Sequence, residues 1–380
     1  MKDQIVLFFA GDFCSTPSTT PIKVSDKLKN LISSSDFSVC NFEIPLKPDG
    51  LTAQKDRYYQ ADDAPAFLEG LGFNLFSFAN NHAFDYGVEG WQKTMNAFQS
   101  KPFGSGTYED AYKIKIVEKD GIKIGFLALC YAARFGVFDN LTDRQGYACA
   151  WIDDFCVNHI IIQAKREVDY LIVLPHDGIE YIDIPIPETI ARYRDFIDYG
   201  ADVVIGTHPH CPQGWEEYKG KPIFYSLGNF LFNSKNDYSY RATNRPHWYE
   251  GLCVRIIIND GVIKYDTINT LNEENLGISI DNRSVRNSHN EKLCNYLRDK
   301  ELYGKVLVRE CESLARVQEM PILDHTFHND TLFSSFKQLV KFAIKKMVHK
   351  PLPNDTSLMN LLKNNTRRNL LLHSIKINHK

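Results

Sequence analysis

The sequence has no Cys-x-x-Cys motif, no apolar segment long enough for a signal peptide or membrane span, and no internal repeat. The nine cysteines of this 380-residue chain are scattered, and none forms a Cys-x-x-Cys pair. An odd, dispersed set of thiols argues against a disulfide framework and favours a reducing compartment. The first apolar run is shorter than the roughly 7–15 residues of a secretory signal and the about 20 of a membrane span. We therefore expect a cytoplasmic protein.

Charge is unevenly distributed along a chain of ordinary globular composition, 43% hydrophobic and 24% charged. Residues 331–380 contain ten Lys or Arg and one acid, Asp355, whereas the rest has 34 basic and 46 acidic residues. An acidic body with a basic tail suggests an anionic partner for the tail. The net charge of −3 favours no partner for the whole chain, and we expect no nucleic acid.

Five short apolar runs each precede a polar cluster of Asp, Glu, Asn or His. Ligands of α/β sheets bind beyond the carboxyl ends of the strands. We therefore expect the five clusters to meet at one edge of a sheet. The runs are Ile5–Ala10, Phe37–Cys40, Leu75–Ala79, Tyr170–Leu174 and Val203–Ile205.

Helix-compatible stretches and hairpins complete the pattern. Asp-Gly pairs favour type I′ turns, so two hairpins are predicted around Asp120-Gly121 and Asp260-Gly261. The alternation predicts a mixed α/β sandwich with antiparallel additions. The helix-compatible stretches are residues 64–71, 90–100 and 187–199.

The character of the chain changes after residue 270. We expect one α/β domain over 1–270, a polar linker and helical segment over 271–330, and a basic amphipathic helical tail over 331–380. Two interpretations of the tail helix, residues 331–350, stay open. It packs its apolar stripe on the body, or it makes peripheral contact with an anionic membrane, an acidic polymer or a synthase.

Two of the polar clusters carry the most chemical information. His208-Pro209-His210 places two imidazoles at i and i+2 in a turn, where both can meet one metal cluster; the alternative is a polar loop with surface histidines. In Asn80-Asn81-His82, an amide oxygen can bind a metal and the histidine can protonate a leaving group. The alternative is that Asn80 or Asn81 caps the following helix.

Asp12, Glu43 and His176 are individually ambiguous, because single acids and histidines after strands are commonly structural. Their joint placement is the argument for a site. Imidazole with carboxylate ligands suits zinc, iron or manganese rather than calcium or magnesium. Two such ions about 3.5–4 Å apart can hold a phosphate and activate water.

These motifs, with Tyr225-Ser226-Leu227-Gly228-Asn229-Phe230, resemble in order and spacing the CapA family of bacterial capsule and poly-γ-glutamate synthesis proteins. The resemblance covers roughly residues 3–270. That family looks like a branch of the calcineurin-like metallophosphoesterases, which fold as two packed β-sheets flanked by helices. The resemblance thus implies a four-layer α/β sandwich.

The resemblance also implies a role for each residue. His82 would be the general acid, Glu43 would bridge two divalent ions of manganese, zinc or iron, and Asn229 would order the floor of the site. The remaining ligands would be Asp12 and His210 for one ion and Asn81, His176 and His208 for the other.

Two positions depart from the family pattern. The wider superfamily has Asp-x-His where this chain has Asp12-Phe13-Cys14, which puts the first ion and activity in question. Asp177 follows His176 where the family has an aromatic residue, and it could orient that histidine. Arg134 could meet an anionic substrate, although a surface salt bridge explains it equally well.

The expected function is a metal-dependent hydrolase of phosphoester type in capsule, exopolysaccharide or poly-γ-glutamate synthesis. Hydrolysis of an amide in the polymer is a variant of the same chemistry. The alternative from another class is a non-catalytic accessory protein that binds the anionic polymer or a synthase.

Overall fold

The computed structural model describes residues 4–53, 58–131, 136–138, 144–233, 247–273 and 277–317. The chain divides into two units, Met1–Lys300 and Glu301–Lys380. The predicted substrate contact Arg134 and the predicted tail helix 331–350 lie outside the described residues. The domain boundaries expected from the sequence stay predictions.

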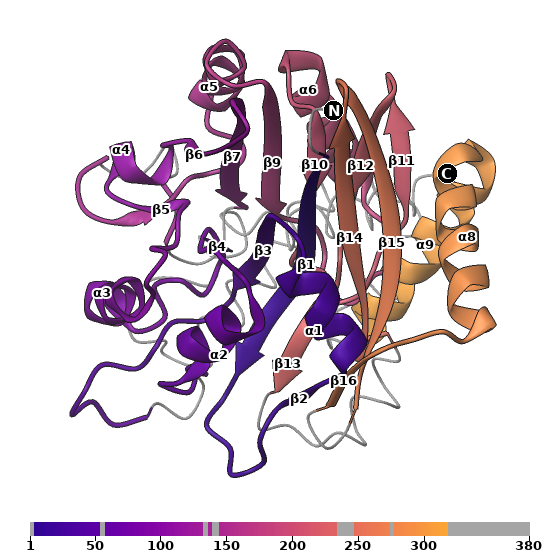
Figure 1. Cartoon of the computed structure of the whole chain (residues 1–380). Helices are drawn as coiled ribbons and strands as arrows, with labels where there is room; N and C mark the ends of the chain where they lie inside the picture. Colours follow the sequence, from indigo (N-terminus) through magenta and orange to yellow (C-terminus); the bar gives the residue numbers. More distant parts are fainter. Residues whose placement is uncertain are drawn as a thin grey trace, which may run out of the picture. The chain divides into compact units, whose positions relative to one another are not determined.

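The first unit is built on two β-sheets (Figure 1). The eight-stranded sheet has the order β2-β16-β15-β14-β1-β3-β4, with β13 also paired to β1, and the six-stranded sheet has the order β11-β12-β10-β9-β7-β6. A short sheet pairs β5 with β8. The strands are β1 (Ile5–Ser15), β2 (Lys23–Val24), β3 (Phe37–Phe42), β4 (Leu75–Ser77), β5 (Ser105–Gly106), β6 (Lys115–Lys119), β7 (Ile122–Cys130), β8 (Ala148–Cys149), β9 (Tyr170–His176), β10 (Val203–Ile205), β11 (Trp215–Tyr218), β12 (Lys221–Phe224), β13 (Asn229–Asn233), β14 (Glu250–Asn259), β15 (Val262–Asn272) and β16 (Gly277–Ile280).

Apolar side chains from both sheets share one core. Phe9 of β1 meets Phe126 of β7 with ring centroids 6.5 Å apart, so the inner faces of the two sheets pack together. On the other side of β1, Phe13 stacks on Phe67 of α2 (Ala64–Leu71) at 6.1 Å. Strands buried on both faces explain the continuous apolar runs of the sequence.

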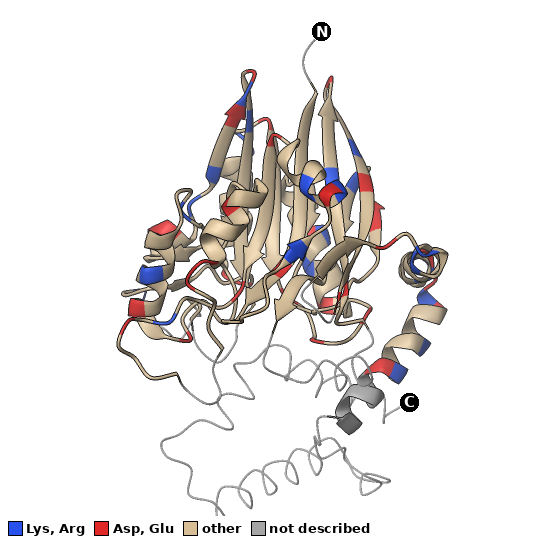
Figure 2. Cartoon of the chain, turned by 60° about the horizontal axis from the view of Figure 1, so that its bottom comes forward, with Lys and Arg blue, Asp and Glu red and all other residues tan. Residues whose placement is uncertain are grey.

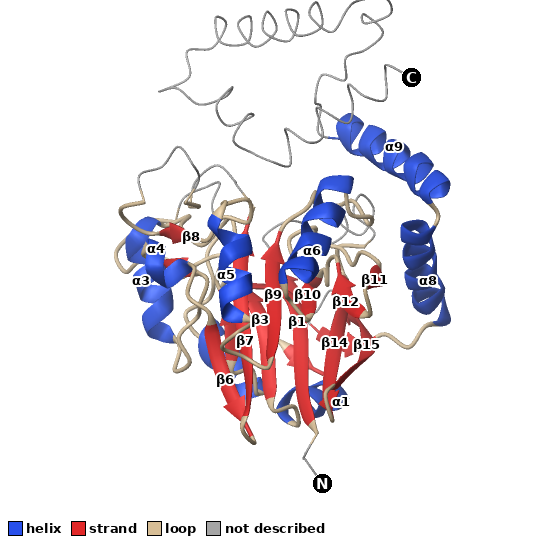
Figure 3. Ribbon diagram, turned by 90° about the horizontal axis from the view of Figure 1, so that it is seen from above, coloured by secondary structure: helices blue, strands red, loops and turns tan. Residues whose placement is uncertain are grey.

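Helices cover the outer faces of the sheets (Figure 3). Of the helices described, α5 and α6 pack together along the six-stranded sheet, and α1 and α2 lie against the eight-stranded sheet. This arrangement confirms the predicted α/β class with two packed sheets and flanking helices. The helices besides α2 are α1 (Asp26–Ser33), α3 (Gly87–Ala97), α4 (Tyr108–Ala111), α5 (Cys156–Ala164), α6 (Pro187–Tyr199), α8 (Ser284–Arg298) and α9 (Lys300–Val317).

Both predicted hairpins are present, and each turns as the sequence indicates. Lys119 pairs with Ile122 across one turn, and Asn259 pairs with Val262 across the other. Both Asp-Gly pairs have positive φ, 52° and 77° at residues 120–121 and 48° and 81° at residues 260–261. These are the backbone conformations of a type I′ turn. In Figure 2, charged residues gather at such tips and on the helices, while the strands are mostly uncharged.

The sequence suggested that the five polar clusters meet at the edge of a single sheet, and this is wrong: the strands before them belong to two sheets. The runs before Asp12, Glu43 and Asn81 belong to β1, β3 and β4, whereas those before His176 and His208 belong to β9 and β10 of the other sheet. The clusters still meet, because the carboxyl ends of these strands lie at the same end of the two sheets (Figure 1).

The segment expected to be a polar linker also contains regular structure. Gly277–Ile280 forms β16 against β15, and α8 begins at Ser284. Its asparagines are bonded inside the protein: Asn290 donates to Asn269 Oδ1 at 2.7 Å, and Asn269 donates to Asn287 Oδ1 at 2.9 Å. Polar composition therefore reflected internal hydrogen bonds as well as contact with water.

All the cysteines whose side chains are described are buried, except the half-buried Cys156. Burial raises the pKa of the Cys149 thiol to about 12. They behave as small apolar residues of the core, as their positions in strand-like runs predict. Over the described ranges, none of the helices has the length and apolar composition needed to cross a bilayer.

Candidate metal centre

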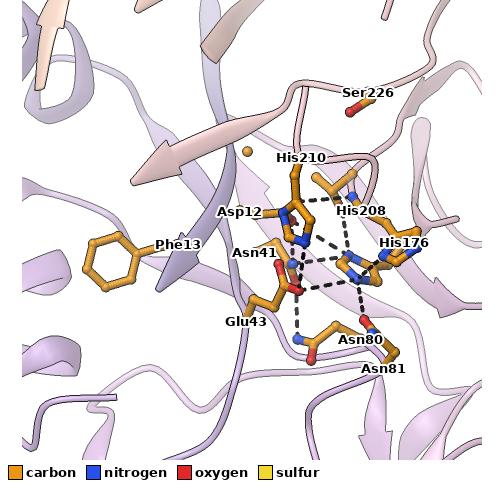
Figure 4. A network of polar contacts seen from close by, with 12 residues as sticks. Asp12, Phe13, Asn41, Glu43, Asn80, Asn81, His176, His208, His210 and Ser226 are labelled. Atoms are coloured by element: carbon orange, nitrogen blue, oxygen red, sulfur yellow. Dashed lines mark hydrogen bonds and ion pairs between the residues drawn. The ribbon is translucent and has the colours of Figure 1, made fainter. Parts of the chain in front are cut away.

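The six predicted ligands converge in one network (Figure 4), in which all are buried except the half-buried Asn81. They come from both sheets, so the packing of the sheets creates the site. In Figure 4 their side chains point toward one another, while Phe13 points away from them. The contributing segments are the end of β1 for Asp12, the residue after β3 for Glu43, the loop after β4 for Asn81, the end of β9 for His176, and the loop after β10 for His208 and His210.

Asp12 is fixed by the close approach of β1 to the turn before β13. Its backbone N–H donates to Gly228 O at 2.9 Å, and a Cβ on the preceding Gly11 would lie 1.9 Å from that oxygen. The carboxylate accepts bonds from Asn41 Nδ2 at 2.7 Å and from the backbone N–H of His208 at 3.0 Å. Burial raises the pKa of Asp12 to about 7, although the bond from Asn41 opposes this.

Glu43 is fully buried, yet neither carboxylate oxygen has a hydrogen-bond partner within the described part of the chain. Its Oε1 lies 3.6 Å from His210 Nε2 and 3.9 Å from both His176 Nε2 and His82 Nε2. Burial, and then the charge of Asp12, raises the pKa of Glu43 well above its usual range. A buried carboxylate surrounded by imidazoles at these distances is suited to a cation.

His176 and His208 face each other across the second part of the site. His176 Nε2 lies 2.8 Å from Asn81 Oδ1 and 3.2 Å from His208 Nδ1. His208 Nε2 is buried and lacks a hydrogen-bond partner among the described residues. Burial, and then neighbouring imidazoles, lowers the pKa of both histidines well below the usual value, so both rings are neutral and able to act as ligands.

Asn229 determines which nitrogen of His210 faces the centre. Its Nδ2 donates to Trp248 O at 2.9 Å, which directs Oδ1 toward His210 Nδ1, also at 2.9 Å. His210 Nδ1 must therefore carry the proton, and Nε2, which faces Glu43, keeps its lone pair. The expectation that Asn229 orders the floor of the site agrees with these contacts.

The His-Pro-His turn has a backbone that L-residues rarely adopt. His208 has φ of 101° and His210 has φ of 57°. Such conformations cost roughly 1–3 kcal/mol each and persist where the surroundings enforce them. Here the bond from His208 N–H to Asp12 Oδ2 and the contact of Asn229 with His210 hold the turn. This backbone conformation directs the imidazole rings of His208 and His210 toward the carboxylates of Asp12 and Glu43 (Figure 4).

His82 lies at the more open side of the network, with 30% of its side chain exposed. Asp85 Oδ2 holds His82 Nδ1 at 2.7 Å, which leaves Nε2 directed at Glu43. Burial lowers the pKa of His82, but the hydrogen bond to Asp85 and the charges of Asp85, Glu180 and Asp12 together raise it above its usual value. An imidazole in this state can donate a proton.

Asn41 is a site residue that was not predicted. Its Nδ2 donates to Asp12 and lies 3.2 Å from His176 Nδ1, so it ties a ligand of each sheet to the other. A signal was available, because Asn41 and Glu43 at i and i+2 share one face of an extended segment. Asn80 is structural: it donates to Phe42 O and accepts from His82 N–H.

The structure shows which residues surround Cys14 and Asp177, the two positions that depart from the family pattern. Cys14 packs with Ile44, Phe232 and Trp248 in a small apolar cluster. Asp177 accepts a hydrogen bond from Thr189 Oγ1 at 2.9 Å in the first turn of α6. That bond directs the Asp177 carboxylate to the helix, so the structure gives no support to a role in orienting His176.

The donor set fits divalent transition ions. It combines neutral imidazoles, two buried carboxylates and an amide oxygen, and the orphaned atoms are the two oxygens of Glu43 and His208 Nε2. One described group of potential ligand atoms, from Asp12, Glu43 and His176, lies within 4.8 Å. Hard ions such as magnesium prefer all-oxygen shells, so the histidines favour manganese, iron or zinc.

Fold and site together define a two-sheet α/β protein with a candidate metal centre at the strand ends. The chain belongs to the family described as bacterial capsule synthesis protein PGA_cap, whose model matches residues 7–234. That range includes all six candidate ligands and His82. The family predicted from the motifs is thereby confirmed.

Curated relatives are similar in the same region. The capsule biosynthesis protein CapA of Bacillus anthracis is 31% identical over 226 residues, 55% of this chain and 53% of that protein. The PGA biosynthesis protein CapA of Bacillus subtilis (strain 168) is 33% identical over 217 residues, 53% of this chain and 55% of that protein. The chain thus spans about half the length of these relatives. Among solved structures, a phosphatase from Mycoplasma pneumoniae is 16% identical and covers 71% of this chain and 95% of its own, at a TM-score of 0.43.

Proposed function

We propose that this chain is a metal-dependent hydrolase of phosphoester type that acts in the synthesis of capsule, exopolysaccharide or poly-γ-glutamate. The observation that carries the proposal is Glu43: a fully buried carboxylate with no hydrogen-bond partner in the described ranges and three imidazole nitrogens within 3.9 Å. Divalent ions, when bound, supply Lewis acidity toward a phosphate ester and lower the pKa of water. The capsule and poly-γ-glutamate context is carried over from the family and its curated relatives.

The protein groups divide into two sets on either side of Glu43. The Asp12 carboxylate lies beside the His210 ring, with Oδ2 3.6 Å from Nδ1. His210 keeps its lone pair on Nε2, so the two residues could contribute Asp12 oxygen and His210 Nε2 as one set of ligands. Asn81 and His208 both adjoin His176 Nε2, which supports those three as the second set. Glu43 would bridge the sets, since its Oε1 is near a histidine of each.

His82 would supply the proton for the leaving oxygen. Asp85 holds Nδ1, so the proton that can be transferred is on Nε2, the nitrogen nearest Glu43. The partial exposure of this ring supports its placement on the side by which a substrate enters. General acids of this kind contribute about 10²–10⁴ to a rate.

The test combines elemental analysis with turnover of bis-p-nitrophenyl phosphate by the full chain. His208→Ala should lose metal and turnover. His82→Ala should keep metal and lose turnover by about 10²-fold or more. His159→Ala, at an exposed position on α5, is the matched control and should match the wild type. Wild-type levels of metal and turnover in His208→Ala would refute the proposal.

The alternative is a non-catalytic accessory protein that binds the anionic polymer or a synthase. The observation that favours it is the apolar packing of Cys14, at the position where the wider superfamily has a metal-binding histidine. Under this alternative the wild-type chain contains metal but hydrolyses no phosphoester or polymer amide, and His82→Ala leaves polymer binding unchanged.

A further inference from the structure

A second cluster of potential ligands lies outside the candidate metal centre. Asp183 precedes α6, His247 precedes β14, and His289 lies on α8. Their ligand atoms are all within 4.8 Å of one another, although the three residues are distant in the sequence. Both His247 Nε2 and His289 Nε2 face the same carboxylate oxygen, Asp183 Oδ2, at 3.9 Å and 3.6 Å.

His247 is held in the form that binds a metal. Its Nδ1 lies 2.6 Å from Glu250 Oε2, so Nδ1–H donates to this carboxylate and Nε2 keeps its lone pair. Arg286, itself buried, donates to the same oxygen of Glu250 at 2.7 Å and keeps the carboxylate in place. A carboxylate behind a histidine is the arrangement that orients imidazole ligands of zinc and raises their basicity.

His289 provides an independent sign of a missing partner. Its Nε2 atom is buried and has no hydrogen-bond partner among the residues described. The His247 and His289 rings are stacked, with centroids 4.5 Å apart and an angle of 16° between the planes. The stacking presents both Nε2 atoms on the side of Asp183. A buried imidazole nitrogen left unsatisfied next to a carboxylate is costly unless something binds there.

We propose that Asp183, His247 and His289 form a second divalent-metal site, of the zinc class. Two imidazoles and one carboxylate occupy three positions of a tetrahedral zinc site, and water can take the fourth. With bonds of about 2.0–2.1 Å, neighbouring ligand atoms in such a site are about 3.4 Å apart. The separations from Asp183 are close to this value, so side-chain shifts of about half an ångström complete the geometry.

An ion at this second site fastens three segments of the first unit together. The loop before α6, the turn before β14 and helix α8 would be joined through one atom. Because the three ligands come together only in the folded chain, the binding of an ion would stabilise the folded state. The turn also carries Trp248, whose ring is 4.7 Å from His210 and whose carbonyl holds Asn229. The second site therefore supports the residues that orient a ligand of the first.

The test measures zinc bound per chain after chelator treatment, removal of the chelator and equilibrium dialysis of the full-length protein against Zn²⁺. Asp183→Asn keeps the size of the side chain and should bind one zinc fewer than the wild type, as should His289→Ala. His159→Ala is the matched control and should bind the wild-type number. In a double variant with His208→Ala the losses should add, because the two sites are separate.

Thermal unfolding gives a second readout that does not depend on activity. Zinc should raise the Tm of the wild type and of His208→Ala more than that of Asp183→Asn. Wild-type zinc content in both Asp183→Asn and His289→Ala overturns the second site. The difference in bound zinc between the wild type and the Asp183→Asn or His289→Ala variant concerns residues outside the first centre. It can therefore be observed even if the protein shows no hydrolase activity, so failure of the proposed function and failure of the second site are distinguishable.

Discussion

Replacing Gly11 with alanine should disrupt the metal centre by displacing the backbone that positions Asp12. The new Cβ would lie 1.9 Å from Gly228 O, whereas real Cβ contacts are essentially never closer than 3.0 Å. Strand β1 and the turn before β13 would have to separate by about 1.1 Å, the difference between these two distances. The neighbouring bond from Asp12 N–H to Gly228 O, 2.9 Å long, would be lost.

The magnitude follows from these two effects. Overpacking of a tight interior costs about 1–3 kcal/mol, and a backbone hydrogen bond contributes about 1 kcal/mol net. We therefore expect Gly11→Ala to lower the free energy of unfolding by about 2–4 kcal/mol, which corresponds to a fall in Tm on the order of 5–10 °C. Asp12 and Asn229, which flank the contact, would move apart, so metal content should fall as well.

Urea unfolding and elemental analysis measure both consequences. Gly70→Ala is the control, because Gly70 is exposed on α2 and a Cβ there meets nothing within 4 Å. The control should be neutral or stabilised by up to about 1 kcal/mol, since alanine favours helix over glycine. A Gly11→Ala chain with wild-type stability and metal content would show that the strand–turn contact does not position Asp12.

Three further outcomes are expected. Asn229→Ala should weaken metal binding at the first centre by about 10–100-fold, measured by competition with a chelator, because His210 loses the acceptor that fixes its tautomer; an unchanged affinity would contradict this. Asp85→Asn should keep the metal but reduce phosphodiester turnover by roughly 10-fold or more, as His82 loses its charged partner; loss of metal instead would point to a structural role. Glu250→Gln should weaken zinc binding at the second site by about 10–100-fold and leave the first centre intact, which zinc titration of the His208→Ala background would reveal.

The sequence was sufficient to predict which strand-end residues come together, whereas their roles as metal ligands and general acid stay predictions. Each ligand follows an apolar run, and such runs become strands whose carboxyl ends gather ligands. The expected role of Asn229 came only from the resemblance of its Tyr-Ser-Leu-Gly-Asn-Phe motif to the family. What composition could not reveal was that two sheets, rather than one, contribute the strands. A short apolar run does not indicate which sheet its strand will join, because strand pairing depends on contacts between residues that are distant in the chain.

The second site could not be predicted from the sequence. Asp183, His247 and His289 follow no strand-end pattern, and they are brought together by the fold. His289 in particular lies in a segment whose asparagine content suggested a linker. The hydrogen bonds of Asn269 and Asn290 show why composition misled, since buried amides can satisfy each other without water.

The buried thiols give the protein an internal reporter of unfolding. Apart from half-buried Cys156, each cysteine with a described side chain is enclosed in the core or at its edge. Alkylating reagents attack the thiolate, and burial keeps both reagent and deprotonation away from these sulfurs. Among the cysteines with described side chains, Cys156 should therefore be labelled first in the native protein, and labelling of the others should follow the opening of the two-sheet core. Mass spectrometry of alkylated peptides would then time how each part of the sandwich comes apart, with no engineered probe.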